Sequence, residues 1–175
     1  MIISHSYFSR LMGTRGTPIP AEKDDVTDKV CISVLGVAGA HQVLLDLSRC
    51  VLLQPTTFDY LKRCPALLYL DLSYTRVLDL SPIRTCTMLR AFNGAGLKLS
   101  NDTGYDALRD LPQLELLILR GSNISNGGRL KASSILRSLD ISFTRIDSIE
   151  FLKDMKRLEE LVMESLSLFT RGNQP

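Results

Sequence analysis

The chain has 175 residues, of which 45% are apolar, and its 21 basic and 19 acidic residues nearly cancel. A chain of this length and composition can bury enough apolar surface for one domain with its own core. The balanced charge, without a block of five like charges, does not resemble a nucleic-acid footprint and gives no sign of an acidic ligand or a membrane surface. No apolar run is long enough to span a bilayer.

The first 28 residues predict an amino-terminal arm that precedes the folded domain. Pro18, Pro20 and the acidic residues at 24, 25 and 28 suit an extended polar segment. Serines and arginines occur here without an acidic residue before Glu22, as in a mitochondrial transit peptide. We expect an uncleaved arm and keep the transit peptide as the alternative. Residues 29–41 hold two apolar runs around a glycine-containing turn, which predicts a strand that caps the domain.

A repeat begins at residue 42 and continues to residue 168. Its central apolar positions are spaced by 25, 22, 25, 22 and 22 residues. They are Leu45, Leu70, Phe92, Leu117, Leu139 and Leu161. In five copies an apolar residue two positions later completes an LxL-like core, which predicts a short strand with both side chains on one side. One such unit cannot bury its apolar side alone, so the near-constant period predicts an array of stacked units.

The copies "LLYLDLSYTRVLDL" and "LRSLDISFTRI" resemble the LxxLxLxx(N/C)xL motif of leucine-rich repeat proteins. More narrowly, "LDLSYTRVLDLSPI" looks like the LDLSxTxI…SPL variety that is common in trypanosomatid leucine-rich repeat proteins. The resemblance implies an α/β fold, a curved right-handed solenoid with about six short parallel strands on a concave face and short helices or turns on the convex side. The leucine-rich repeat domain would span residues 29–175, with the cap strand at 29–41 and the repeats at 42–168.

The spacing of the copies also predicts what lies between the strands. The 25-residue copies leave room for short convex helices, capped by Thr56 or Thr57 in one and by Asn101 or Asp102 in the other. The 22-residue copies leave room only for a single turn or an extended segment. The inward positions of the strands predict a core that includes Leu70, Leu72, Leu117, Leu119, Leu139 and Ile141.

Three of the four cysteines occupy repeat positions, and only Cys31 has no place in the pattern. Cys64 and Cys86 lie three residues before the first leucine of a copy, in a slot that holds leucine or methionine elsewhere. We therefore predict buried, unpaired thiols rather than a metal site or a disulfide. Gly94 stands where a leucine belongs, which predicts that the strand of the third copy is the weakest.

Residues that flank the LxL pair point outward and form rows across the concave face. Exposed aromatic, isoleucine and arginine side chains are the types enriched at interface hot spots. We predict a partner-binding face in which two aromatic rings flank two glycines. Its residues are Tyr69, Asp71, Tyr74, Asn93, Ile118, Arg120, Arg137, Asp140, Phe143 and Val162. The alternative is that these side chains only pack on one another across the sheet.

The sequence offers little material for catalysis or for a bound metal or cofactor. Its two histidines, His5 and His41, both precede the clear repeats, and "GAGLK" lacks the further residues of a phosphate loop. Asp46 and Asp71 should lie on adjacent strands about 4.8 Å apart, close enough to bind a cation. Solvated aspartates of an LDLS strand are the simpler interpretation. We predict no enzyme, no catalytic residue, no metal and no cofactor.

These observations predict a protein-protein interaction module, a structural subunit or adaptor of a larger intracellular assembly. We expect protein partners on the concave face, the carboxyl-terminal edge strand and the amino-terminal arm, and neither nucleic acid nor a membrane. The alternative is a substrate-recognition or regulatory subunit of an enzyme such as a ubiquitin ligase or a phosphatase. The resemblance favours a cytoplasmic, cytoskeletal or flagellar location, with a mitochondrial one as the alternative.

Overall fold

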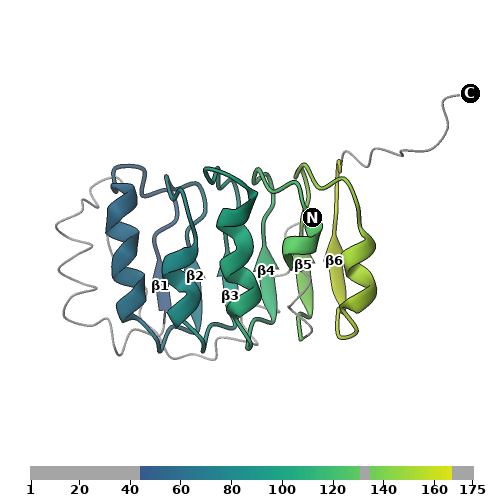
Figure 1. The fold of residues 1–175 in the computed structure, drawn as a ribbon, viewed down its shortest axis with the longest axis horizontal. Helices are drawn as coiled ribbons and strands as arrows, with labels where there is room; N and C mark the ends of the chain where they lie inside the picture. Colours follow the sequence, from purple (N-terminus) through teal and green to yellow (C-terminus); the bar gives the residue numbers. More distant parts are fainter. Residues whose placement is uncertain (1–43, 131–134, 167–175) are drawn as a thin grey trace, which may run out of the picture.

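The computed structural model describes residues 44–130 and 135–166. The predicted arm at 1–28, the cap strand at 29–41, both histidines and Cys31 lie outside the described residues. Six parallel strands follow one another in a single sheet in chain order (Figure 1). They are β1 (Leu44–Asp46), β2 (Tyr69–Asp71), β3 (Ala91–Asn93), β4 (Leu116–Ile118), β5 (Ser138–Asp140) and β6 (Glu160–Val162).

The register of the sheet follows the repeat. Each central apolar residue lies beside its counterpart in the next strand, as Leu70 lies beside Phe92 and Leu117 beside Leu139. Each strand with its returning segment forms one coil of a solenoid. The predicted fold and the register of all six copies are therefore confirmed.

Short 3-10 helices carry the chain back along the side of the sheet opposite the concave face (Figure 1). They are η3 (Pro55–Arg63), η4 (Ser81–Thr85), η5 (Asp102–Asp110), η6 (Gly127–Leu130) and η7 (Glu150–Asp154). The 25-residue copies hold the two nine-residue helices, η3 and η5, whereas the others have five residues or fewer. The predicted difference between long and short copies is confirmed.

Only one of the two predicted helix caps is present. The Asn101 side chain caps η5 by accepting a hydrogen bond from the backbone N–H of Gly104, at 3.2 Å. The Thr56 or Thr57 prediction is wrong, because η3 begins at Pro55 and both threonines lie inside it. Proline fixes φ in the helical range and has no N–H to satisfy, so it starts a helix without a capping side chain.

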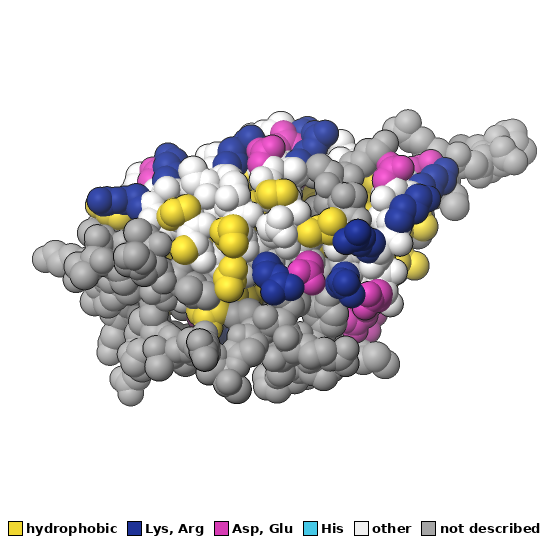
Figure 2. All heavy atoms as spheres, turned by 90° about the horizontal axis from the view of Figure 1, so that it is seen from below, with side chains coloured by type: hydrophobic (Ala, Val, Ile, Leu, Met, Phe, Trp, Pro, Cys, Tyr) yellow, Lys and Arg dark blue, Asp and Glu magenta, His cyan; other side chains and the backbone are white. Residues whose placement is uncertain are grey.

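Charged side chains link the amino ends of the last four strands. Arg90 lies 2.5 Å from Glu115, Glu115 lies 3.7 Å from Arg137, and Arg137 lies 2.6 Å from Glu159. Figure 2 views this end of the strands and shows dark blue and magenta side chains in alternation. We call these four residues the charge ladder. Each step joins one coil to the next.

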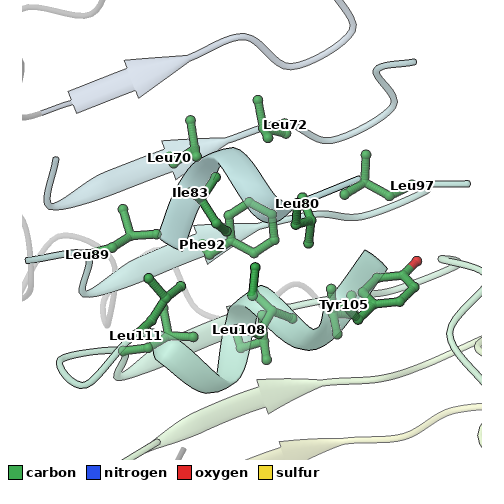
Figure 3. Close-up of a cluster of buried hydrophobic side chains, with 14 of the residues drawn as sticks. Leu70, Leu72, Leu80, Ile83, Leu89, Phe92, Leu97, Tyr105, Leu108 and Leu111 are labelled. Atoms are coloured by element: carbon green, nitrogen blue, oxygen red, sulfur yellow. The ribbon is translucent and has the colours of Figure 1, made fainter. Parts of the chain in front are cut away.

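The core fills the space between the sheet and the helices, and Figure 3 shows its central part. The six leucines and isoleucines that the sequence predicts as core are all fully buried. Cys50, Cys64 and Cys86 are buried and free of disulfides, as predicted. Burial raises the pKa of the Cys64 thiol, against a smaller opposite effect of Arg63. Burial, and then the neighbouring Cys64, raises the pKa of Cys86 to about 12.

The third coil replaces a core leucine by Gly94 and keeps the strand. A Cβ atom on Gly94 would lie 2.8 Å from the ring of Phe92 and 2.9 Å from Leu97, so these side chains fill the space a leucine would take. This coil also lacks a polar residue at position 97. The Asn123 side chain of the next coil bonds both the N–H and the C=O of Leu99, at 3.0 and 2.9 Å. A side chain of the neighbouring coil thus satisfies backbone groups two residues after Leu97.

Candidate functional site

The last residue of each strand lies beside its counterpart in the next strand and forms the concave-face row, as the repeat predicts. The row consists of Asp46, Asp71, Asn93, Ile118, Asp140 and Val162. Four of its members are Asp or Asn, and each accepts a hydrogen bond from the backbone N–H two residues later. These bonds are Asp46–Ser48 at 2.9 Å, Asp71–Ser73 at 2.8 Å, Asn93–Ala95 at 3.1 Å and Asp140–Ser142 at 2.8 Å. This is the Asx turn, and it bends the chain where the strand ends.

The residue three positions after this row has a positive φ in every coil. The angles are 61° at Arg49, 56° at Tyr74, 70° at Gly96, 68° at Gly121, 56° at Phe143 and 51° at Ser165. Left-handed backbone is uncommon for an aromatic residue. Thr75 and Thr144 hold it in place, because their hydroxyls donate to the carbonyls of Leu72 and Ile141, at 2.6 and 2.7 Å. The two aromatic residues therefore project from turns bonded on both sides.

Tyr74 and Phe143 are 52% and 49% exposed. The guanidinium of Arg49 lies 5.5 Å from the centre of the Tyr74 ring, and that of Arg120 lies 4.5 Å from the Phe143 ring. Both distances are within the range of a cation–π contact. Together with two glycines these residues form the aromatic rim, which consists of Arg49, Tyr74, Gly96, Arg120, Gly121 and Phe143.

The two glycines of the rim are not equivalent. A Cβ atom on Gly96 would lie 2.5 Å from the Tyr74 ring, so that ring covers Gly96. A Cβ atom on Gly121 would have nothing within 4 Å. The open floor between the two rings is therefore at Gly121, on the Phe143 side.

The middle of the concave face is buried. Ala91, Leu116 and Ser138 point to this face by the strand alternation, yet each is at most 2% exposed. Asp71 and Asp140 are only 8% and 4% exposed. The accessible part of the predicted surface is thus the rim at the carboxyl ends of the strands.

Asp71 is fully engaged in hydrogen bonds to the protein itself. Besides the Ser73 N–H, it accepts from the Tyr69 hydroxyl at 2.9 Å and from the Asn93 amide at 2.8 Å. Burial, and then the charge of Asp71, raises the pKa of Tyr69. The structure thus gives the Asp71 carboxylate a structural role, in the turn after β2 and between β2 and β3. Within residues 44–130 and 135–166, no three His, Cys, Asp or Glu side chains are grouped to hold a metal.

Arg120 is held by two carboxylates as well as by a ring. Its guanidinium lies 3.1 Å from Glu164 and 3.9 Å from Asp140, while it stacks on Phe143. The side chain is about a third exposed. Its position is therefore fixed while part of it stays accessible.

The structure separates some of the predicted residues from the rim. Tyr69 and Arg137 lie at or before the amino ends of β2 and β5, at the opposite end of the strands from Phe143. Asn93, Ile118 and Val162 are half-buried and lie in the concave-face row, between the amino ends of the strands and the rim. Arg49 belongs to the rim although the sequence did not predict it, because only its contact with the Tyr74 ring, 25 residues away, reveals its role.

No protein-family model and no curated protein sequence matches the chain. Solved structures do. An internalin C2 of Listeria monocytogenes aligns with a TM-score of 0.62 at 18% identity, over 75% of this chain and 54% of its own. A leucine-rich repeat protein of Leptospira interrogans aligns with a TM-score of 0.60 at 17% identity, over 78% and 40%. The fold is a leucine-rich repeat solenoid.

A second internalin of Listeria monocytogenes, inlF, aligns with a TM-score of 0.54 at 18% identity, over 81% of this chain and 51% of its own. The leucine-rich repeat solenoid described here thus spans about half the length of these structures. Identities this low establish the fold alone, and the narrower resemblance to trypanosomatid proteins stays a prediction. None of the described helices has the length and apolarity that crossing a membrane requires.

Proposed function

We propose that this leucine-rich repeat chain is a non-catalytic protein-interaction module that binds another protein on the aromatic rim. Its role would be that of a structural subunit or adaptor in a larger intracellular assembly. The observation that carries the proposal is the pair of half-exposed rings, Tyr74 and Phe143, on turns fixed by side-chain hydrogen bonds around an open floor at Gly121.

The geometry of the rim suits an inserted segment of a partner. The two rings lie three strand spacings apart, about 14 Å. That gap admits one extended segment or the side chain of a loop. Because the turns are already fixed, binding orders little of this protein's own backbone, which lowers the free-energy cost of association. Aromatic and arginine side chains are the residue types that most often dominate interface energies.

The polar groups of the concave face support a binding role over catalysis. Asp71 and Asp140 are buried and bonded to turn N–H groups, and Tyr69 donates its hydroxyl to Asp71. These groups maintain the turns that present the rim. The amino-terminal arm and the carboxyl-terminal edge strand are further proposed contact surfaces, and the cytoplasmic, cytoskeletal or flagellar location remains part of this proposal.

Replacing the rings tests the proposal. Asparagine tolerates the left-handed backbone, so Tyr74→Asn and Phe143→Asn remove the rings while the turns stay in place. The matched control is Met88→Ala, since Met88 is 53% exposed and lies outside the rim. Proteins captured by the wild-type chain should be identified by mass spectrometry, and their affinity for each purified variant then measured.

Each ring variant should weaken a rim-bound partner by at least about tenfold, or 1.4 kcal/mol, with the circular dichroism spectrum unchanged. Met88→Ala should bind as the wild type does. If both ring variants bind the partner with wild-type affinity, the aromatic rim is not the binding site.

A further inference from the structure

The last coil differs from the inner coils in how its apolar side chains are covered. The first leucine of the inner copies is fully buried at Leu67, Leu89, Leu114 and Leu136. Its counterpart in the last coil, Leu158, is only partly buried. Leu161 and Leu166 are partly buried as well, and Met163 is 43% exposed. The apolar core is therefore open beside β6.

The backbone of β6 is also open on its outer side. Glu160 donates to the Arg137 carbonyl at 2.9 Å, and Val162 accepts from the Ile141 N–H at 2.9 Å, so these two residues bond towards β5. By the alternation of a parallel strand, Leu161 and Met163 direct their N–H and C=O groups away from β5. Within the described residues, no strand pairs with this outer edge.

The charge ladder ends at Glu159, just before β6, where an ion pair is present on one side of the carboxylate. Glu115, inside the ladder, has Arg90 on one carboxylate oxygen and Arg137 near the other, and its side chain is 18% exposed. Glu159, at the end, bonds Arg137 through one oxygen, and its side chain is 58% exposed. No basic side chain of the described residues forms an ion pair with its second oxygen. Glu115 shows how an acid of this ladder is arranged when a basic residue lies on both sides.

Two acidic side chains lie on the concave side at β6, Glu160 in the strand and Glu164 just beyond it, with the apolar Val162 between them. Glu160 accepts from the Ser138 hydroxyl at 2.9 Å, and Glu164, just beyond the strand, pairs with Arg120. The exposed Lys156 and Arg157 belong to the turn before the strand. A segment laid along the outer edge would therefore meet the Glu159 carboxylate at the start of the strand, with Glu160 and Glu164 beside it on the concave side.

We infer that the outer edge of β6 binds an extended basic segment of another protein as a seventh parallel strand. An arginine or lysine of that segment lies beside Glu159, one residue before the position that pairs with Glu160. The bound strand also covers Leu158 and Leu161. This inference rests on the proposed function, because it names the partner chemistry for the edge strand proposed there as a further contact surface, and it concerns a surface separate from the aromatic rim.

Two synthetic peptides serve as probes with the full chain. One copies residues 135–143 with lysine in place of Asp140, so that it is basic and carries Arg137 at the matching place before a strand. The other peptide has, in addition, glutamate in place of that arginine. Fluorescence anisotropy of the labelled peptides gives the affinities. The arginine peptide should bind at least about tenfold more tightly than the glutamate peptide, and Glu159→Arg should reverse this order.

Backbone pairing is tested at Met163. Met163→Pro removes an N–H that points outward, a position where an edge strand tolerates proline. Met163→Ala is the matched control, because it shortens the side chain and keeps the N–H. The proline variant should lose at least about tenfold in affinity, whereas the alanine variant should stay within about twofold of the wild type.

Several outcomes would overturn the inference. They are equal affinity of both peptides, unchanged binding to Met163→Pro, or no binding of either peptide up to about 1 mM. Self-association that Met163→Pro abolishes but neither peptide inhibits would assign the edge to a second copy of the chain instead. Tyr74→Asn and Phe143→Asn should leave peptide binding unchanged, so failure at the edge and failure at the rim are separable.

Discussion

The turns after β2 and β5 are near copies in sequence and in backbone. Asp71 and Asp140 each close an Asx turn, and each is followed three residues later by an aromatic residue at a φ of 56°. Thr75 and Thr144 then donate to the carbonyl of the residue that follows each strand, Leu72 and Ile141. The local sequence thus determines the turn.

The two rings differ in what supports them. Tyr74 rests on Gly96 of the next coil, with Arg49 of the preceding coil over its ring. Phe143 is contacted by Arg120 of the preceding coil, and Gly121 beside it is open. The two rings are about equally exposed, so neighbouring coils decide which ring covers a glycine and which lies beside an open one.

The largest expected effect tests whether the two coils are equivalent in the core. Leu70 and Leu139 occupy the same position and are both fully buried. Leu70→Ala and Leu139→Ala should each lower the free energy of unfolding by about 2–5 kcal/mol, from lost burial and a residual cavity. Urea denaturation followed by circular dichroism measures this.

Met88→Ala, at an exposed position, is the control and should stay within about 0.5 kcal/mol of the wild type. A core variant with wild-type stability would show that its coil does not contribute to the cooperative fold. The two turns being compared would then lie in coils that differ in stability.

The equivalence of the coils follows from the sequence, because the period fixes the register and the LxL spacing fixes which side chains face inward. The contacts between coils do not follow in the same way. Tyr74 and Gly96 hold the same repeat position in neighbouring coils, so the period places them side by side but does not show that the ring lies over the glycine. The hydrogen bond from the Leu99 N–H to Asn123 joins residues 24 positions apart that do not share a repeat position.

The candidate site was predictable only in part for the same reason. The alternation places Asp71, Asp140, Ala91, Leu116 and Ser138 on the concave face, but their burial depends on tertiary packing, to which a two-residue period is blind. The positive φ of the rim residues was equally hidden, since only Gly96 and Gly121 are residue types that favour it.

The next effect isolates the support under Tyr74. Gly96 and Gly121 have nearly the same φ, 70° and 68°, so alanine at either adds similar backbone strain of about 1 kcal/mol. Gly96→Ala should cost about 1 kcal/mol more than Gly121→Ala, because only its new methyl group meets the Tyr74 ring. Urea denaturation of both variants gives the difference.

A double-mutant cycle with Tyr74→Asn provides the control. Without the ring, the extra cost of Gly96→Ala should disappear, whereas the cost of Gly121→Ala should not change. An extra cost that persists without the ring would mean that Tyr74 does not pack on Gly96 in solution, and the two aromatic residues would then be equally free.

The smallest expected effect is a pH dependence of the free energy of unfolding that comes from the β2 coil and not from the β5 coil. Cys86 lies at the end of the β2 coil, in the repeat position that Met155 holds at the end of the β5 coil. Of these two coils, the β2 coil alone therefore has a titratable thiol at this position. Since burial raises the pKa of Cys86 from 9.0 to about 12, the unfolded chain releases this proton at lower pH than the folded chain. The thiol's contribution to stability is therefore complete below pH 9 and declines as the pH rises towards 12.

Between pH 9 and 10 this contribution should fall by about 1 kcal/mol, and Cys86→Ala should flatten that part of the profile. The measurement goes no higher than pH 10 because burial also raises the pKa of Tyr69 and that of Tyr105, the latter to about 12, and both add a further decline above that pH. Cys64, whose pKa burial also raises, is present in both proteins and leaves part of the slope in Cys86→Ala. Urea denaturation at pH 8, 9 and 10 in reducing buffer gives the slopes. An unchanged slope in Cys86→Ala would show that this thiol ionises as readily in the folded protein as in the unfolded chain, which contradicts its burial beside the β2 coil.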